Sequence, residues 1–436
     1  LTSKGQTQTN TQKDTLVAGD INSQGALTMQ AGGNITAQKS VTAASVQTNS
    51  QNLNIGADLS SGGQTRLGTT QKIQIGGQLN SQGGLLVRAG DNVDIGKGIA
   101  AGAIDLKGQN VTVGNTMTSA GVLLADTASL RVGGDVQSGQ DMRIKAHTGG
   151  VTAKTIVSLQ NLDLNAQGPI TTDNISAKQS AQVQSQSKVG SDTIVSGGPL
   201  LLVAQSDITA KHIYSGGTLT AQTQGNLQAQ TVQSEGQLTL NAAQNINIQD
   251  RLATNSQMSV KAGQNLNVQG STQSGDRMKI EAKDIRLNGQ VLSGADSTMD
   301  ATNGHVHFGS TYASHSAANV TGQCITLQGA QSQGNMSLQS NGCGIVSSAS
   351  IIANGNLTAR SDTHITVNGH IASGGNMQLQ AGTTLLSSGM IVSGLTGANT
   401  ASQNMRINAG GDLQAQHIQS RGHMQVQSEG HIHTGA

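Results

Sequence analysis

A short amphipathic pattern recurs every 19 to 20 residues along this 436-residue chain. Examples are INSQGALTMQAGGNITAQ from Ile21, LNSQGGLLVRAGDNVDIG from Leu79 and IASGGNMQLQAGTTLL from Ile371. Each follows Φ-x-S-x-G-x-Φ-x-Φ-x-A, where Φ is apolar, and then a turn and a short Φ-x-Φ run. Matches begin near residues 1, 21, 41, 59, 79, 99, 117, 136, 156, 175, 194, 213, 232, 252, 272, 291, 312, 330, 351, 371, 391 and 418. About 22 tandem units of fixed period are the signature of a repeat architecture.

Within each unit, apolar and polar residues alternate with a period of two, which indicates a strand with one buried face. Leu238, Leu240 and Ala242 are expected to point inward, and Thr239 and Asn241 outward. The apolar runs last three to six residues and are broken by SGG, GQN, GDN or NAQG, in which Gly and Asn favour turns. A helix would need apolar spacings of three and four over ten residues or more, and no unit has them.

The constant period favours a coil over an antiparallel meander, because a meander does not require like strands to recur at a fixed spacing. We therefore predict an all-β chain in which each unit is one turn of a parallel solenoid with three short strands. Each strand would pair with its copy one coil later, and outward Asn, Gln, Ser and Thr would form polar ladders. One continuous segment over residues 1–436, of about 22 coils at roughly 4.8 Å each, would form a rod of about 105 Å.

Composition narrows the possible core and the possible partners. With 58 Gly, 2 Tyr, 1 Phe and no Trp, the core must consist of Val, Ile, Leu, Met and Ala, which implies a narrow interior of many similar layers. Charged residues make up 11% of the chain and the net charge is +1, so we expect no nucleic-acid partner. No run of 18 apolar residues occurs, so we expect no membrane span.

The repeats resemble the haemagglutination-activity repeats of filamentous haemagglutinin and of the exoproteins of contact-dependent growth inhibition. The resemblance covers the whole chain, and its specificity comes from some twenty units in tandem with a Gln/Asn/Gly bias. It implies a right-handed parallel β-helix that is exported through an outer-membrane transporter barrel (two-partner secretion) to the outside of the bacterial cell. It also implies adhesion to host cells or toxin delivery to neighbouring bacteria.

The expected function is therefore that of a rod-like extracellular stalk that projects an adhesive or toxin-delivering module. The chain is interpreted as an internal segment of a longer protein, because no NPNL- or NPNGI-type secretion motif and no toxin module is recognised in it. An alternative is that this segment itself contains the receptor-binding surface for a host or neighbouring bacterial cell. A remoter alternative is a polysaccharide-degrading β-helix enzyme.

The repeat is interrupted in two regions, and these are the candidate partner-contact regions. In the coil from Ile391, about eight extra residues separate the corner IVSG from the strand NMRINA, which predicts a loop insertion at about 394–404 that includes Leu395 and Asn399. The coils of about 291–350 are also irregular, and they hold Phe308 and Tyr312. These four residues are the predicted contacts.

The irregular coils also contain both cysteines of the chain. Cys324 and Cys343 are 19 residues apart, which is one coil, so their Cα atoms would stack about 4.8 Å apart, within the range of about 4.4–6.8 Å that a disulfide accepts. An extracellular protein would permit that bond. Two stacked free thiols remain the other possibility.

No catalytic residue, cofactor or metal site is predicted. His305 and His307, like His431 and His433, share a strand face, but zinc sites use three or four ligands and no further ligand is evident in the sequence. Glycosidic chemistry requires paired carboxylates, and the 23 acidic residues are scattered. Glu281 lies within a run of basic residues that reads as a solvated charged face.

Overall fold

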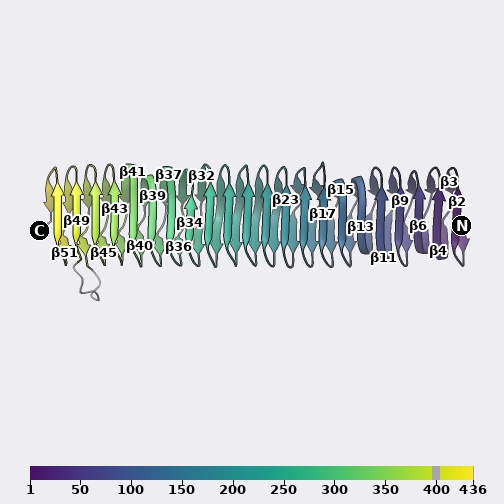
Figure 1. Cartoon of the computed structure of the whole chain (residues 1–436), viewed down its shortest axis with the longest axis horizontal. Coiled ribbons are helices and arrows are strands. Elements are labelled where there is room, and N and C mark those ends of the chain that lie inside the picture. The colour runs from purple at the N-terminus through teal and green to yellow at the C-terminus, as the bar shows by residue number, and fades with distance from the viewer. Residues whose placement is uncertain (395–402, 436) are drawn as a thin grey trace. The chain divides into compact units, whose positions relative to one another are not determined.

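The computed structural model describes residues 1–394 and 403–435, in which every regular element is a β-strand (Figure 1). Over these residues the chain makes about 22 turns of a parallel β-solenoid, which confirms the predicted fold class. It divides into two compact units, Leu1–Gly216 with strands β1 (Thr2–Ser3) to β26 (Ile208–Ser215), and Gly217–Ala436 with strands β27 (Leu219–Thr223) to β53 (Ile432–Thr434). No helix that could cross a bilayer is found among the described residues.

A coil of the first unit shows how the repeat folds. Its three strands are β17 (Met142–Ala146), β18 (Val151–Thr152) and β19 (Thr155–Ser158). They pair in parallel with β20 (Leu162–Ala166), β21 (Ile170–Thr171) and β22 (Asn174–Ala177) of the next coil. Met142 faces Leu162 and Ile156 faces Ile175, so the register advances by 20 and 19 residues (162 − 142 and 175 − 156). The repeat period in the sequence is therefore the length of one coil.

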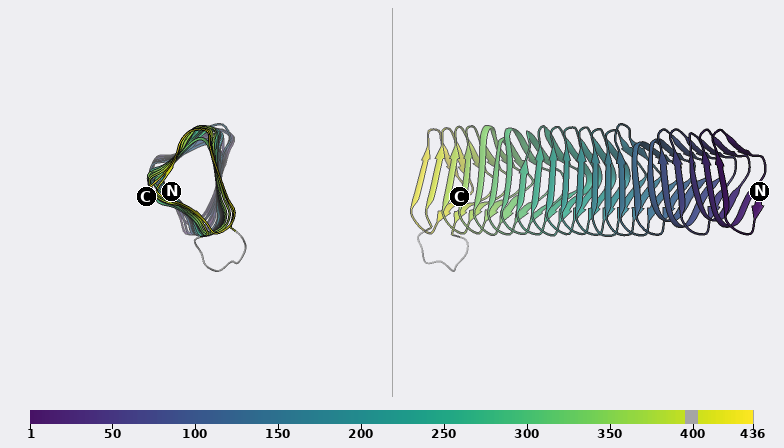
Figure 2. Two further views of the ribbon diagram at one scale, coloured as in Figure 1. Left: turned by 90° about the vertical axis from the view of Figure 1, so that its left-hand side faces the viewer. Right: turned by 45° about the vertical axis from the view of Figure 1, so that its right-hand side comes forward.

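The second unit repeats this arrangement. Strands β31 (Met258–Ala262), β32 (Asn265–Val268) and β33 (Ser271–Ser274) form one coil. They pair in parallel with β34 (Met278–Glu281), β35 (Asp284–Leu287) and β36 (Val291–Ser293). Seen along the solenoid, the coils have a three-sided outline, with one strand on each side (Figure 2).

The core of each unit is a column of aliphatic side chains. Leu238, Leu240 and Ala242 of β29 (Leu238–Ala242) are buried, whereas Asn241 between them is exposed, as the alternation predicts. Each strand has only two or three inward positions, so a coil contributes a thin layer that is covered by the layers of its two neighbours. Burial of this apolar area, at about 25 cal/mol per Å², is the main favourable term in folding.

Buried serines close the corner that follows the Φ-x-S step. Ser158 is 1% exposed, and its Oγ lies 2.8 Å from the carbonyl oxygens of both Gln140 in the preceding coil and Asn161 in its own coil. Ser196 and Ser215 bridge their coils in the same way, to the carbonyls of Gln179 and Gly198. Because a buried hydroxyl without a partner costs about 1–3 kcal/mol, these bonds fix the corner to the coil below it.

Asparagines form the polar ladders that the sequence predicts. Asn245 Nδ2 donates to Asn226 Oδ1 at 2.9 Å, and Asn265 Nδ2 donates to Asn245 Oδ1 at 3.0 Å. The same oxygens also accept the backbone N–H of the residue stacked above them. The turns are therefore joined from coil to coil by side chains as well as by the main chain.

Glycines stack at one corner of the first unit, where consecutive coils approach closely. A Cβ on Gly114 would overlap the carbonyl oxygen of Gly96, and a Cβ on Gly133 would overlap that of Gly114. Gly84, in β11 (Gln78–Ala89), has no atom within 4 Å of the position a Cβ would take. Substitutions at Gly114 and Gly84 therefore separate close coil stacking from the general effect of replacing a glycine.

We expect Gly114→Ala to lower the stability of the first unit by about 1–3 kcal/mol, because its methyl group must displace a carbonyl of the coil below. Gly84→Ala is the matched control and should change stability by less than about 0.5 kcal/mol. Guanidinium unfolding followed by circular dichroism measures both. Equal midpoints for the two variants would contradict the stacking constraint.

Candidate functional site

Two register shifts mark the coils that carry the cysteines. Strands β37 (Ser297–Phe308), β39 (Ala318–Leu327) and β41 (Met336–Ser347) pair in parallel in that order. The register shifts between Ala301 and His305 in the first pair, and between Gly322 and Cys324 in the second. Both shifts lie within the region of about 291–350 where the repeat is irregular. Such bulges re-aim side chains.

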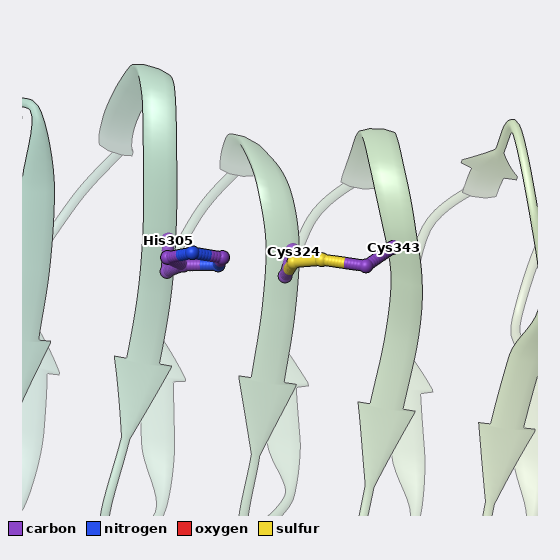
Figure 3. Close-up of side chains that lie close together, drawn as sticks. All are labelled: His305, Cys324 and Cys343. Carbon is purple, nitrogen blue, oxygen red and sulfur yellow. A yellow bond between two sulfur atoms is a disulfide. The ribbon is translucent and has the colours of Figure 1, made fainter.

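Cys324 and Cys343 lie on adjacent coils and are joined as a disulfide, with their Cα atoms 5.0 Å apart (Figure 3). Cys324 pairs in register with Gly344, so Cys343 is one residue away from direct stacking. In a regular strand, the residue before Gly344 would point to the opposite face from Cys324. Cys343 is instead exposed, because the bulge turns its side chain outward.

Gly344 and Ser340 hold this bulge. Gly344 has φ +112°, a left-handed conformation that favours glycine. Its N–H donates to Ser340 Oγ at 3.1 Å, and Ser340 Oγ donates to the carbonyl of Gln323 at 2.6 Å. Ser340 is only 1% exposed. The buried serine therefore ties the bulge to the residue that precedes Cys324.

His305 is the third member of this cluster. It pairs in register with Cys324, so the two side chains stack on the same outer face. One ligand atom each of His305, Cys324 and Cys343 lie within 4.8 Å of one another (Figure 3). The sequence analysis grouped His305 with His307 and missed this arrangement. The signal was present, since both 324 − 305 and 343 − 324 equal 19, one coil length.

His307 lies on the same strand face but beside other groups. Its pairing partners are Arg286 on one side and Thr326 on the other. Partial burial and then the nearby Arg286 guanidinium lower the pKa of His307, because both disfavour the imidazolium. His307 is thus a neutral neighbour of the cluster at ordinary pH.

The prediction that Phe308 and Tyr312 contact a partner is wrong. Both side chains are fully buried, and their rings stack with centroids 4.8 Å apart and planes 19° apart. The Tyr312 hydroxyl is hydrogen bonded to Ser297 Oγ, and burial raises the pKa of Tyr312 to about 12. The aromatic pair fills the core of the irregular coils, where the usual layer of aliphatic residues is interrupted.

Leu395 and Asn399, the other predicted contacts, lie outside the described residues. The pairing on either side of them does show where the longer coil is. Met377 faces Met405, a step of 28 residues (405 − 377), whereas Leu357 faces Met377, a step of 20 (377 − 357). The asparagine ladder bridges this coil, since the Asn404 N–H donates to Asn376 Oδ1 at 2.9 Å. The eight additional residues therefore leave the stacking of the coils intact.

One groove in the second unit is charged. It has a volume of about 530 Å³ and is lined by Lys261, Glu281, Lys283 and Asp300 among others. Glu281 and Asp300 are register partners, a pairing of carboxylates that the sequence analysis missed. Glu281 forms ion pairs with Lys261 and Lys279, and these side chains are well exposed, so the pairs add little stability. The hydrogen bond and charge of Glu281 raise the pKa of Lys279.

A groove of the first unit shows the more common character of the outer face. Its volume is about 610 Å³, and its lining includes Thr42, Ser60, Asn80 and Gln82. None of its lining residues is charged or titrates near neutral pH. The groove offers hydroxyl and amide groups for hydrogen bonding but no acid–base pair.

No protein-family model, curated protein or solved structure matches this chain. The functional argument below therefore depends on the geometry of the coils and on the character of the repeats.

We expect the native chain to show no reactive thiol under oxidising conditions, because Cys324 and Cys343 are paired. Reduction should lower the free energy of unfolding of the second unit by about 3 kcal/mol, as expected for a closed loop of this length. Thiol titration and denaturant unfolding with and without reductant measure these effects. The Cys324→Ser/Cys343→Ser double variant is the control and should not respond to reductant. Two titratable thiols in the oxidised native chain would contradict the disulfide.

Tyr312 makes the stability of the second unit sensitive to alkaline pH. Because its pKa is raised from 10 to about 12 in the folded state, its contribution is fully present below pH 10 and is lost as the pH rises through about 12. Tyrosinate absorbance of the native chain minus that of Tyr312→Phe isolates this titration, since the chain has one other tyrosine, Tyr214. A midpoint near 10 in the difference curve would show that the phenol is not buried.

Proposed function

We propose that this chain is a stalk segment of a secreted bacterial surface filament, which projects an adhesive or toxin-delivering module from the cell. The observation that carries the proposal is the regular coil-on-coil pairing within each unit, where strands advance by 19 or 20 residues in register. Such a stack resists bending because main-chain bonds, side-chain ladders and a continuous core all join the same neighbouring coils.

The pairing also suits export in an unfolded state. Repeats that contact only their neighbours can nucleate at one place and propagate coil by coil. A chain that emerges gradually from a narrow pore could therefore fold on the far side as each coil appears. This property supports the expected partner, an outer-membrane transporter barrel, and a location on the outside of the bacterial cell.

The resemblance of the repeats to those of filamentous haemagglutinin and contact-dependent growth inhibition exoproteins adds to the proposal. It brings adhesion to host cells and toxin delivery to neighbouring bacteria as the two roles of the module that the stalk carries. Both roles require a spacer between the producing cell and its target, so the stalk function is common to them.

Receptor binding by this segment itself is the second candidate. The burial of Phe308 and Tyr312 removes the two aromatic anchors on which it was based, and binding hot spots are enriched in aromatic residues. What still favours it is the coil between Met377 and Met405, which has eight residues more than the coil before it.

The remoter alternative, a polysaccharide-degrading enzyme, would depend on the Glu281–Asp300 groove. Paired carboxylates are what glycosidic chemistry requires. Glu281 is however engaged with Lys261 and Lys279, which favours its ionised form and does not suit a general acid. We therefore rank this activity below both the stalk and the receptor-binding functions.

The stalk proposal is tested by export and by cell binding. Fused behind a two-partner secretion domain and expressed with the matching transporter, residues 1–436 should reach the cell exterior in a protease-resistant, strand-rich form. The purified chain should then show no saturable binding to host or bacterial cells. Retention inside the cell would contradict export. Saturable binding that is lost on deletion of residues 395–402 would replace the stalk by the receptor-binding function.

A further inference from the structure

His305, Cys324 and Cys343 bring one imidazole and two sulfur atoms together on the outer face of three consecutive coils. Thiolate and imidazole are the ligands that Zn²⁺ prefers in proteins, and two Cys with one His is a known three-ligand set that leaves the fourth position to water. The cluster is therefore a combination of residues that suits a soft, tetrahedral metal ion.

The solenoid positions these ligands without help from a loop. His305 and Cys324 are direct register partners, and the bulge at Gly344 turns Cys343 toward the same face. The His305 N–H is fixed by Asp284 Oδ1 at 2.8 Å, and Ser340 fixes the bulge. Strands and main-chain bonds thus hold the backbone of all three ligands, which favours a preorganised site.

The distances are compatible with one ion. At a Zn–S distance of about 2.3 Å, tetrahedral ligands lie roughly 3.8 Å apart. The three ligand atoms already lie within 4.8 Å of one another, and the Cα atoms of the cysteines are 5.0 Å apart. Rotation of the cysteine side chains is enough to separate the two sulfurs to that spacing. His305 and Cys343 are exposed and Cys324 is half-buried, so an ion can reach them.

We propose that the reduced chain binds one Zn²⁺ ion through His305, Cys324 and Cys343, so that the same pair is a disulfide when oxidised and part of a zinc site when reduced. The two states exclude each other, because each sulfur lends its electrons either to its partner sulfur or to the metal. The redox state of the surroundings then selects between a covalent staple and a metal staple across adjacent coils.

The change of state balances with a thiol as the reductant. Two small-molecule thiols give up two electrons and two protons and become a disulfide, and the Cys324–Cys343 bond breaks to give two thiols. Binding of Zn²⁺ then forms two Zn–S bonds and one Zn–N bond and releases the two thiol protons. His305 contributes the lone pair of a neutral ring nitrogen.

The test uses the full chain reduced with a phosphine, which avoids the competition for zinc that a thiol reductant would introduce. Calorimetry with Zn²⁺ should show one site per reduced chain that is absent from the oxidised chain. Co²⁺ should give a near-ultraviolet sulfur-to-metal charge-transfer band, which the other histidines cannot produce. His305→Ala should weaken Zn²⁺ binding at least about tenfold, or about 1.4 kcal/mol.

His307→Ala is the matched control, since His307 lies on the same strand face beside Arg286 and Thr326, and its affinity should stay within about twofold of the native value. The Cys324→Ser/Cys343→Ser double variant should lose the Co²⁺ band while keeping the strand spectrum of the native chain. The proposal is overturned by a reduced chain that shows no charge-transfer band, or by equal Zn²⁺ affinity in the double variant. Equal weakening by His305→Ala and His307→Ala would remove His305 from the ligand set.

Discussion

The parallel pairing of each coil with the next is the interaction on which the rest of the structure depends. It satisfies backbone N–H and C=O groups that would otherwise be buried without partners at the core, and it brings like residues into vertical register. Once register is set, a leucine lies on a leucine or methionine, as Leu238 does with Met258, and an asparagine lies on an asparagine, as Asn245 does with Asn265. The core and the ladders are therefore consequences of one pairing rule.

The irregular coils show how this rule accommodates exceptions. The register shifts in β37, β39 and β41 leave the pairing on either side of them intact, and two aromatic rings fill the interior at that level. The same shifts turn Cys343 outward beside Cys324 and His305. A structural irregularity thus gives this part of the outer face a chemistry that its regular corners, made of Ser, Gly and Asn, do not have.

Much of the fold could be predicted because the repeat encodes both the period and the faces of the strands. Alternation placed Leu240 inside and Asn241 outside, and the 19-residue separation of the cysteines placed them on adjacent coils. The burial of Phe308 and Tyr312 could not be read in the same way, because an irregular coil has no template to say which positions point inward. His305 was missed for a different reason: neighbours along the strand were considered, whereas its relevant neighbour is one coil away.

The asparagine ladder through Asn356, Asn376 and Asn404 has a consequence for how such genes change. It continues unbroken across a coil of 28 residues, so the stack tolerates coils of unequal length as long as the contacts above and below are kept. A whole coil presents nearly the same upper and lower surface as its neighbours. Recombination between misaligned repeats can therefore add or remove complete coils and yield a chain that still folds, which makes length an easily inherited variable.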